Sequence, residues 1–362
     1  MARVLINVPA KARRGEIIEI KTLISHPMES GFRTGTNGTM IPRDIITLFR
    51  CTHNGSEIFR AAGNRRQSVY LVLHRRGRER HARIPLDRRQ RLCAERNRRT
   101  RRRMKLAHGF VVAGLVLASP AATVGEIPLG ERHSGYELMT PELRAMQDDD
   151  AANPGMLSVL DGEALWNRAD GASGKSCARC HGDATSSMRG VATRYPAVDA
   201  VHRRPIDLEQ RVNVCRVEYQ QAPPLAFESK ELLALAAYLG HLSKGLPITI
   251  AYGDETRPFI AAGREIFELR QGQLNLSCAQ CHDDNWGQHL AGASIPQAHP
   301  TGYPLYRLEW QSLGSLRRRL RACMIGMRAE PYADVAPEIV DLELYLAWRA
   351  RGLNLETPAV RP

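Results

Sequence analysis

Two short stretches decide the fold: Cys177-Ala-Arg-Cys180-His181 and Cys278-Ala-Gln-Cys281-His282. Both have the pattern Cys-x-x-Cys-His, and they contain four of the eight cysteines of the chain. The spacing sets two thiols about one helical turn apart, with an imidazole directly after the second thiol. Two copies of this pattern in one chain indicate a duplicated unit that carries the same chemistry twice.

The pattern is the attachment signature of haem c, in which the thiols bond to the vinyl groups and the histidine becomes the proximal iron ligand. Paired Cys-x-x-Cys motifs also occur as disulfides and in zinc sites. The histidine in both copies favours haem, and a thioredoxin-like role lacks the βαβ frame that it needs. We therefore predict two covalently bound haem c groups, attached through Cys177, Cys180, Cys278 and Cys281, with His181 and His282 on the irons.

The surroundings of the two motifs repeat in the same order. A helix-forming segment precedes each motif (162–166 and 263–267), one further cysteine follows after 38 or 45 residues, and an apolar segment closes each unit (235–239 and 342–346). Apolar residues recur at helical spacing in the closing segments. Each unit resembles a small class I cytochrome c: a helix with the motif at its end, a loop region and a closing amphipathic helix. The expected fold is mainly α, a tandem pair of cytochrome c-like domains.

The second axial ligand of each iron has several candidates. Cys215 and Cys323 lie where a methionine or histidine usually completes the iron, and a thiolate there would lower the reduction potential. The two cysteines could instead pair as a disulfide or remain inert buried thiols, and Met188, Met324 or Met327 could bind the iron. Matching positions in two haem units argue against the disulfide, so ligation by Cys215 and Cys323 is the prediction.

The basic charge of the chain is confined to one stretch. The formal net charge is +13, and residues 61–103 alone carry 16 Arg, no Lys and 3 acidic residues, which is also a net of +13. A nucleic-acid surface mixes Lys, Arg, polar and aromatic residues on folded elements. Nucleic acid is therefore not an expected partner, and residues 61–103 are expected to be unstructured.

Residues 104–125 have the pattern of a secretory signal peptide: a methionine, a basic residue, an apolar core over 110–118 and then small residues. A buried core helix is the alternative. No run of about 20 apolar residues is present, so no stable membrane anchor is predicted. Because such a signal acts at an N-terminus, we expect the physiological chain to begin at Met104 and to be exported to the periplasm. Residues 1–103 would then be upstream sequence joined by a gene-model or frameshift error.

The first 60 residues alternate apolar and polar positions around the turn signals Asn37-Gly38 and Asn54-Gly55, which is typical of antiparallel strands. The segment Glu19-Ile-Lys-Thr-Leu-Ile-Ser-His-Pro-Met-Glu29 resembles the start of SoxZ, the β-sandwich subunit of a bacterial sulfur carrier. The resemblance stops near Arg60. A few strands without their partners bury no sandwich core, so we expect an incomplete β-sandwich fragment without a function in this chain.

Residues 104–362 resemble SoxA, the dihaem cytochrome subunit of the thiosulfate-oxidising SoxAX complex. The most specific match is Arg319-Leu-Arg-Ala-Cys-Met-Ile-Gly-Met-Arg-Ala-Glu-Pro-Tyr332. The resemblance implies His/Cys ligation of both haems, by His181 with Cys215 and by His282 with Cys323. It also implies that Cys323 is the catalytic residue, found as a persulfide, and that Arg319 binds the substrate.

The implied reaction is oxidative conjugation of thiosulfate to a cysteine of a carrier protein, an L-cysteine S-thiosulfotransferase activity with electrons passed to haem. The implied partners are a SoxX-type small cytochrome c, in a heterodimer, and a SoxYZ-type carrier. Arg319 lies four residues before Cys323, so on a helix both face the same side, and a guanidinium suits the oxygens of thiosulfate. Arg211 stands in the same relation to Cys215, so spacing alone does not choose between the haems.

Three further arginines near Cys323 are expected on a solvated or propionate-pairing face: Arg317, Arg318 and Arg321. The competing hypothesis for function is a dihaem electron-transfer cytochrome without sulfur-transfer chemistry. The expected domains are a SoxZ-like β fragment (1–60), the Arg-rich stretch (61–103), the signal peptide (104–125) and two cytochrome c-like domains (126–245 and 246–362).

The start-site hypothesis predicts what the cell contains. N-terminal sequencing or intact mass of the natively expressed protein is expected to find a mature chain that begins after the signal peptide at 104–125. A mature chain that contains Ala2 to Arg103 would contradict the hypothesis.

Overall fold

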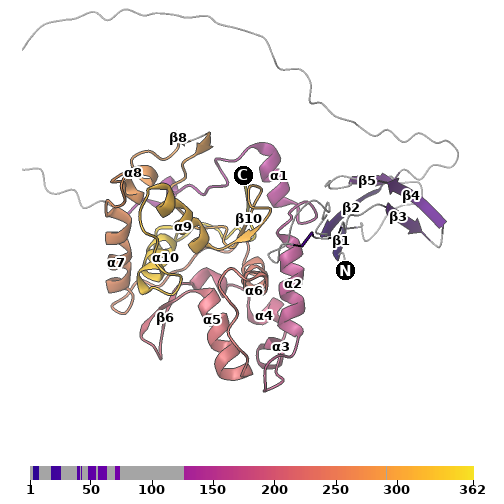
Figure 1. Cartoon of the computed structure of the whole chain (residues 1–362), viewed down its shortest axis with the longest axis horizontal. Coiled ribbons are helices and arrows are strands. Elements are labelled where there is room, and N and C mark those ends of the chain that lie inside the picture. Colours follow the sequence, from indigo (N-terminus) through magenta and orange to yellow (C-terminus); the bar gives the residue numbers. More distant parts are fainter. Residues whose placement is uncertain are drawn as a thin grey trace, which may run out of the picture.

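The computed structural model describes residues 3–7, 18–25, 39–40, 42, 48–53, 56–62, 70–73, 126–290 and 292–362. The predicted signal peptide (104–125) and most of the Arg-rich stretch lie outside these residues. Within the described ranges, no helix is both long enough and apolar enough to cross a membrane. The architecture from residue 126 onward is mainly helical and contains the two predicted units (Figure 1).

The first unit follows a lead-in with the helices η1 (Leu129–Glu131) and α1 (Pro141–Asp148). Its main elements are α2 (Met156–Asn167), α3 (Cys177–His181), α4 (Ala184–Ser187), η2 (Ala192–Arg194), β6 (Ala197–Asp199), β7 (Arg204–Ile206), α5 (Leu208–Cys215), η3 (Arg216–Gln220) and α6 (Lys230–His241).

The second unit repeats the order of the leading helix, the motif helix, the hairpin, the cysteine helix and the closing helix. Its elements are α7 (Arg257–Glu268), α8 (Cys278–His282), β8 (His289–Leu290), β9 (Ala293–Ser294), β10 (Leu305–Arg307), β11 (Ser312–Gly314), α9 (Leu316–Gly326), α10 (Pro337–Arg349) and β12 (Val360–Arg361). Strand β10 pairs antiparallel with β11 and parallel with β12. Helices α7 to α10 gather on one side of Figure 1, and α2 to α6 lie beside and below them.

In each unit a glycine lets the first and closing helices cross closely. A Cβ on Gly162 of α2 would come within 2.1 Å of the Ala234 carbonyl oxygen of α6. A Cβ on Gly263 of α7 would come within 2.0 Å of the Asp341 carbonyl oxygen of α10. The predicted helix before each motif and the predicted closing helix after it are both present. Their close contact explains why both leading segments carry glycine at the same place.

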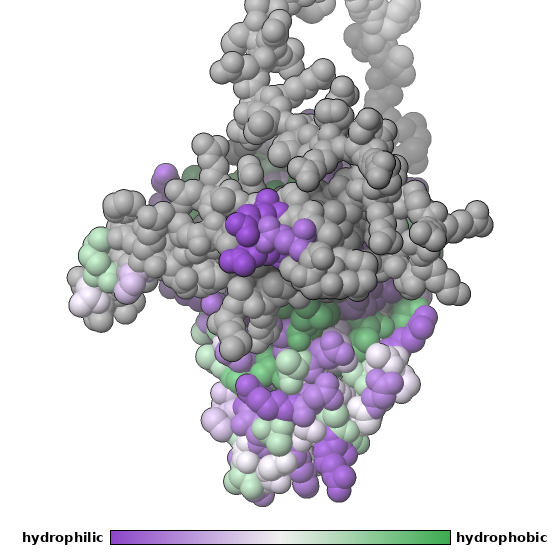
Figure 2. Space-filling model, turned by 90° about the vertical axis from the view of Figure 1, so that its right-hand side faces the viewer, coloured by the Kyte–Doolittle hydropathy of each residue, from purple (hydrophilic) through white to green (hydrophobic). Residues whose placement is uncertain are grey.

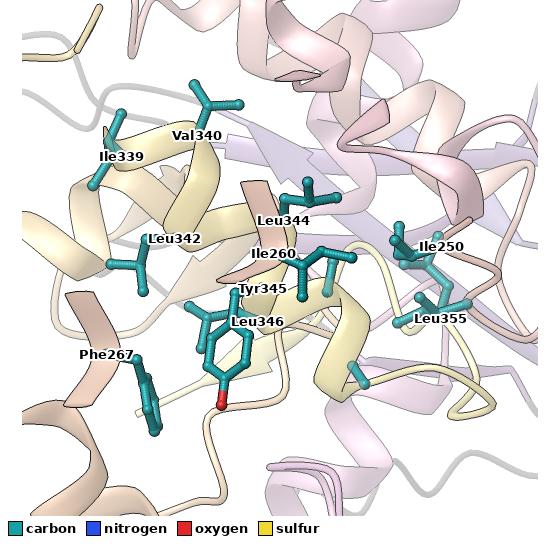
Figure 3. Packing of buried hydrophobic residues seen from close by; sticks show 13 residues of the cluster. Ile250, Ile260, Phe267, Ile339, Val340, Leu342, Leu344, Tyr345, Leu346 and Leu355 are labelled. Atoms are coloured by element: carbon teal, nitrogen blue, oxygen red, sulfur yellow. The ribbon is translucent and has the colours of Figure 1, made fainter. Parts of the chain in front are cut away.

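Two buried clusters form around these crossings. The first contains Trp166 of α2 and Tyr238 of α6, and the second contains Phe267 of α7 and Tyr345 of α10. Figure 3 shows the second cluster, in which apolar side chains from α7, α10 and the flanking segments face one another. Its members are Ile248, Ile250, Ile260, Phe267, Ile339, Val340, Leu342, Leu344, Tyr345, Leu346, Ala347, Ala350 and Leu355. The segment that follows the predicted boundary at residue 245 is packed, because Ile248 and Ile250 belong to this core.

The position of the attachment motifs differs from the prediction. We expected each motif at the end of the preceding helix, but each forms a short helix of its own, α3 or α8. The reason lies in the intervening turns, in which Gly171 and Gly272 adopt positive φ angles of 68° and 72°. A continuous helix cannot include such residues, so the chain leaves α2 or α7 and starts a new helix at the motif.

Five strands from the N-terminal region form two small sheets. β1 (Arg3–Asn7) pairs antiparallel with β2 (Ile18–Ser25), which pairs with β5 (Tyr70–Leu73), and β3 (Leu48–His53) pairs with β4 (Ser56–Ala62). The predicted antiparallel strands are thereby confirmed. The expectation that 61–103 is unstructured is wrong for the end of β4 and for β5, because the apolar run of β5 supplies a partner for β2.

Arg317 is buried where the two units meet, which corrects the prediction of a solvated or propionate-pairing face. Its guanidinium forms an ion pair with Asp207, the N-cap residue of α5, and donates a hydrogen bond to the Glu343 carboxyl of α10 at 3.3 Å. The prediction failed because it considered only the neighbours of Arg317 along its own helix, whereas both carboxylates come from other elements. Arg321 is exposed, as predicted. A buried guanidinium is tolerated here because the Asp207 carboxylate carries the opposite charge and the Glu343 carboxyl accepts a hydrogen bond from it.

The close crossing of α7 and α10 predicts a stability effect. Gly263→Ala is expected to lower the free energy of unfolding by about 1–3 kcal/mol, because the new methyl group meets the Asp341 carbonyl and the helices must move apart. The measurement is urea denaturation of the haem-loaded protein. The control is Gly253→Ala, since a Cβ on Gly253 would meet no atom within 4 Å. Equal stability of both variants would contradict the role of the crossing.

The carboxyl group of Glu343 predicts a pH dependence of stability. Burial raises its pKa to about 8, although the neighbouring Arg317 acts in the opposite direction. In the unfolded chain the same carboxyl loses its proton near pH 4.3. The folded state therefore keeps the proton up to a higher pH than the unfolded chain does. The stabilising contribution is complete below about pH 4.3 and is lost as the pH rises toward about 8.

We therefore expect the free energy of unfolding to fall as the pH rises from 5 to 8, and Glu343→Gln to make this fall smaller. The measurement is urea denaturation across this pH range. Glu255→Gln, at an exposed position, serves as the matched control. An unchanged pH dependence in Glu343→Gln would contradict the argument.

Candidate haem sites

The first attachment motif is held in place by local caps and by one aromatic ring. Ser176 caps α3 by accepting the backbone N–H of Arg179 at 3.1 Å, and the helix ends at Gly182. The buried Trp166 of α2 lies near His181, with 5.6 Å between ring centroids, and donates its indole N–H to the Gly182 carbonyl at 3.3 Å. Helix α2 therefore positions the proximal histidine.

The side chains of the first motif are accessible. Cys180 and His181 are exposed, and Cys177 is half-buried. This end of the molecule lies low in Figure 1, and hydrophilic and hydrophobic residues are intermixed over the lower part of the face in Figure 2. The Cys180 thiol and the His181 imidazole are therefore open to solvent, and the Cys177 thiol is partly so.

The second motif has the same arrangement, and a hydrogen bond orients its histidine. Ser277 and Gln280 form a reciprocal capping box at the start of α8. Phe267 lies near His282, with 6.4 Å between ring centroids. His282 donates its Nδ1–H to the Pro296 carbonyl at 2.6 Å, since a carbonyl oxygen only accepts. That hydrogen bond fixes the tautomer and leaves Nε2 free for iron.

The pKa of His282 suits this role. Burial lowers it, while the Pro296 carbonyl acts in the opposite direction and the positive charge of Arg319 lowers it further. A neutral imidazole is the form that binds a metal. The second unit thus presents a proximal ligand that is already oriented and deprotonated at Nε2.

Each distal cysteine lies at the site of its own motif. Burial raises the pKa of Cys177, and the nearby Cys215 at the end of α5 adds to the effect. Burial likewise raises the pKa of the Cys278 thiol to about 11, and the nearby Cys323 of α9 raises it further. The structure therefore brings together the two sets of residues that the sequence analysis assigned to the two haems.

The described cysteines of both units are free: Cys177, Cys180, Cys215, Cys278, Cys281 and Cys323. The alternative disulfide between Cys215 and Cys323 is therefore not formed. Among the methionine candidates, Met324 and Met327 are buried, and Met188 packs against the first core cluster. Axial ligation by Cys215 and Cys323 stays a prediction.

The donor sets fit haem c. Within the described ranges, no group of three or more His, Cys, Asp and Glu side chains is arranged to hold a metal ion by itself. Each motif offers two free thiols on one short helix and an imidazole beside an aromatic ring, which is the set that covalent haem attachment uses. The residues present would hold one haem per unit, through Cys177, Cys180 and His181 and through Cys278, Cys281 and His282.

Arg319 lies on α9 with Cys323, as the spacing predicted, and is half-buried. Tyr303, which the sequence predictions did not include, is a half-buried neighbour of both. Burial raises the pKa of Tyr303 to about 12, while Arg319 lowers it and Cys323 raises it. A signal was present in the sequence, because Tyr-Pro occurs at 195–196 and at 303–304, in both cases 20 residues before the tyrosine's distal cysteine.

Comparison with known families gives two matches. The model described as "SoxA/TsdA, cytochrome c domain" matches residues 161–248 and 262–355. The model described as "Sulphur oxidation protein SoxZ" matches residues 6–68. Both resemblances are confirmed, and the second continues beyond Arg60, where we expected it to stop.

Individual proteins are similar over most of the two units. An L-cysteine S-thiosulfotransferase subunit SoxA from Pseudaminobacter salicylatoxidans is 38% identical over 253 residues, which are 70% of this chain and 88% of the relative. The protein of that name from Rhodovulum sulfidophilum is 35% identical over 231 residues, which are 64% of this chain and 80% of the relative.

A solved structure is similar in the same region. The crystal structure of SoxXA from P. pantotrophus has a TM-score of 0.62 and 31% identity, over 64% of this chain and 87% of that one. The match supports the tandem arrangement of cytochrome c domains that the helices and motifs show.

Proposed function

Because this chain belongs to the SoxA/TsdA cytochrome c family, we propose that it is the dihaem subunit of a periplasmic L-cysteine S-thiosulfotransferase. Relatives with up to 38% identity carry the transferase name. The observation that carries the proposal is the second site, where Cys323 and the half-buried Arg319 lie on one helix beside the motif of His282. A soft sulfur nucleophile next to a guanidinium suits a sulfur oxyanion.

The proposed reaction joins the sulfane sulfur of thiosulfate to the cysteine sulfur of a carrier protein. In balanced form, R–SH and S2O3²⁻ give R–S–S–SO3⁻, one proton and two electrons. Haem c, when bound, supplies one-electron acceptors close to the reacting sulfurs. The chain itself must bind thiosulfate, present a sulfur atom to it and hold the carrier thiol nearby.

Cys323 is the residue proposed to present that sulfur. Its side chain is half-buried, so it is reachable from outside while partly shielded from water. The Cys323 thiolate would bond to the sulfane sulfur while two electrons pass to the haem acceptors, giving Cys323–S–S–SO3⁻. The carrier thiolate would then attack that sulfane sulfur, forming R–S–S–SO3⁻ and releasing the Cys323 thiolate. Arg319, one turn earlier on α9, would orient the sulfonate oxygens. His181 with Cys215 and His282 with Cys323 would hold the two haem irons.

The proposed partners follow from the relatives. The solved relative is titled SoxXA, which supports a SoxX-type small cytochrome c in a heterodimer with this chain. A SoxYZ-type carrier would supply the acceptor thiol. The SoxZ match at residues 6–68 shows that a carrier-type sequence accompanies the cytochrome region in this chain.

The catalytic role of Cys323 is tested by Cys323→Met in the haem-loaded protein, with thiosulfate, the small cytochrome and a carrier thiol. The conjugation rate is expected to fall at least about 100-fold, because the nucleophile is removed. Cys215→Met, the equivalent change at the first haem, is the matched control and is expected to keep most of the conjugation activity. Intact mass reports the haem count and any extra sulfur on Cys323. Undiminished conjugation by Cys323→Met would favour the plain electron-transfer cytochrome.

A further inference from the structure

The two units match residue by residue before their distal cysteines. A two-stranded hairpin precedes each cysteine helix: β6–β7 before α5, and β10–β11 before α9. The registers are the same, since Asp199 pairs with Arg204 and Arg307 pairs with Ser312 at the equivalent ends. Asp199 and Arg307 therefore occupy equivalent positions, each the last residue of the first strand, although their charges are opposite.

In the first unit, the Asp199 carboxylate neutralises Arg211, the arginine four residues before Cys215. Asp199 forms an ion pair with Arg211, and its side chain is only 5% exposed. Asp199 also accepts the backbone N–H of His202 at 2.9 Å, and this bond together with the His202 and Arg211 side chains keeps its pKa far below the usual range. Partial burial lowers the pKa of Arg211, but its hydrogen bonds to Asp199 and Tyr195 raise it overall. Arg211 is thus committed to a carboxylate.

In the second unit, Arg319 is equivalent to Arg211 but has no acidic partner among the described residues. The position of Asp199 holds a second guanidinium, that of Arg307. Burial lowers the pKa of Arg307, and the positive charge of Arg319 lowers it further, whereas Cys323 raises it. Since the equivalent strand end in the first unit places Asp199 against Arg211, the same geometry places Arg307 beside Arg319 and Cys323, in agreement with these electrostatic effects.

The position of Arg307 is fixed by its other contacts. Its Nε–H donates to the Pro362 carbonyl at 2.7 Å, and its guanidinium lies 5.2 Å from the centroid of the Trp310 ring. Its ion pair with Glu309 is long, at 3.4 Å, and the Glu309 side chain is 68% exposed, so water screens that charge. Two guanidiniums at one half-buried site repel each other, and a bound anion removes the repulsion.

We propose that Arg307 and Arg319 together bind the sulfonate oxygens of thiosulfate, a divalent oxyanion, beside Cys323, and that the Asp199–Arg211 ion pair closes the equivalent position beside Cys215. The inference rests on the proposed function and deepens it. It adds Arg307 as a substrate-binding residue, and it gives a physical reason why the second site, and not the first, receives the substrate.

Binding is tested with the haem-loaded full chain by isothermal titration calorimetry at low ionic strength, with thiosulfate and with sulfate as a redox-inert divalent probe. Arg307→Gln is expected to raise the Kd of both anions about 10-fold or more, since one charge-assisted contact is lost. Arg307→Asp, which restores the charge pattern of the first unit, is expected to abolish measurable binding. Wild-type affinity in Arg307→Gln would overturn the proposal.

Two further variants separate binding from structure. Arg318→Gln makes the same change in net charge one residue from Arg319, but its guanidinium contacts Trp310 and Glu228 instead. It is expected to keep the Kd within about two-fold. Arg307→Lys keeps the positive charge and is expected to keep binding within about five-fold. If Arg307→Lys loses binding as completely as Arg307→Asp, Arg307 has a structural role and the proposal falls.

Failure of this inference is distinguishable from failure of the proposed function. If conjugation proceeds and Arg307→Gln leaves the KM for thiosulfate unchanged, the transferase stands and the arginine pair is refuted. If anion binding depends on Arg307 but no conjugate forms with carrier and small cytochrome, the anion site stands and the transferase is refuted. The expected result is a raised KM in Arg307→Gln with kcat changed by less than about three-fold.

Discussion

The close crossing of two helices in each unit is the constraint on which the sites depend. Gly162 and Gly263 allow backbone to approach backbone, so α2 packs on α6 and α7 packs on α10 without an intervening side chain. The same leading helices carry Trp166 and Phe267, the rings that lie near the proximal histidines. Packing at the crossing therefore fixes where each histidine stands, and the attachment motif can be a helix of only five residues.

Once the two units share this frame, single side chains decide how they differ. The scaffold around the distal cysteines has the same hairpin register in both copies. An aspartate at one position produces a neutral, closed arrangement around Arg211, and an arginine at the equivalent position produces a concentration of positive charge around Arg319. The two units have equivalent hairpins, and the residue at one strand end leaves the arginine beside Cys215 neutralised and places a second positive charge near the arginine beside Cys323.

The sequence was sufficient for the features that depend on neighbours along the chain. The motifs, the leading and closing helices and the shared helix of Arg319 and Cys323 all follow from local spacing, and the structure has them. The sequence did not predict the contacts of a side chain whose partner lies on another helix or strand. Arg317 was expected in solvent but pairs with carboxylates of α5 and α10, and Arg307 was not singled out, because only the folded hairpin brings it to Arg319.

The net charge of the whole chain does not predict which ligand the second site binds, because the charge at that site comes from side chains that folding brings together. The excess of +13 equals that of residues 61–103, whereas the cytochrome units carry more acidic than basic residues. An anion that approaches the second site is attracted at short range by two guanidiniums, whose charges are screened beyond about 10 Å at ordinary ionic strength. Recognition of thiosulfate on this view requires two arginines held together by a strand end and a helix, and it does not require a basic protein.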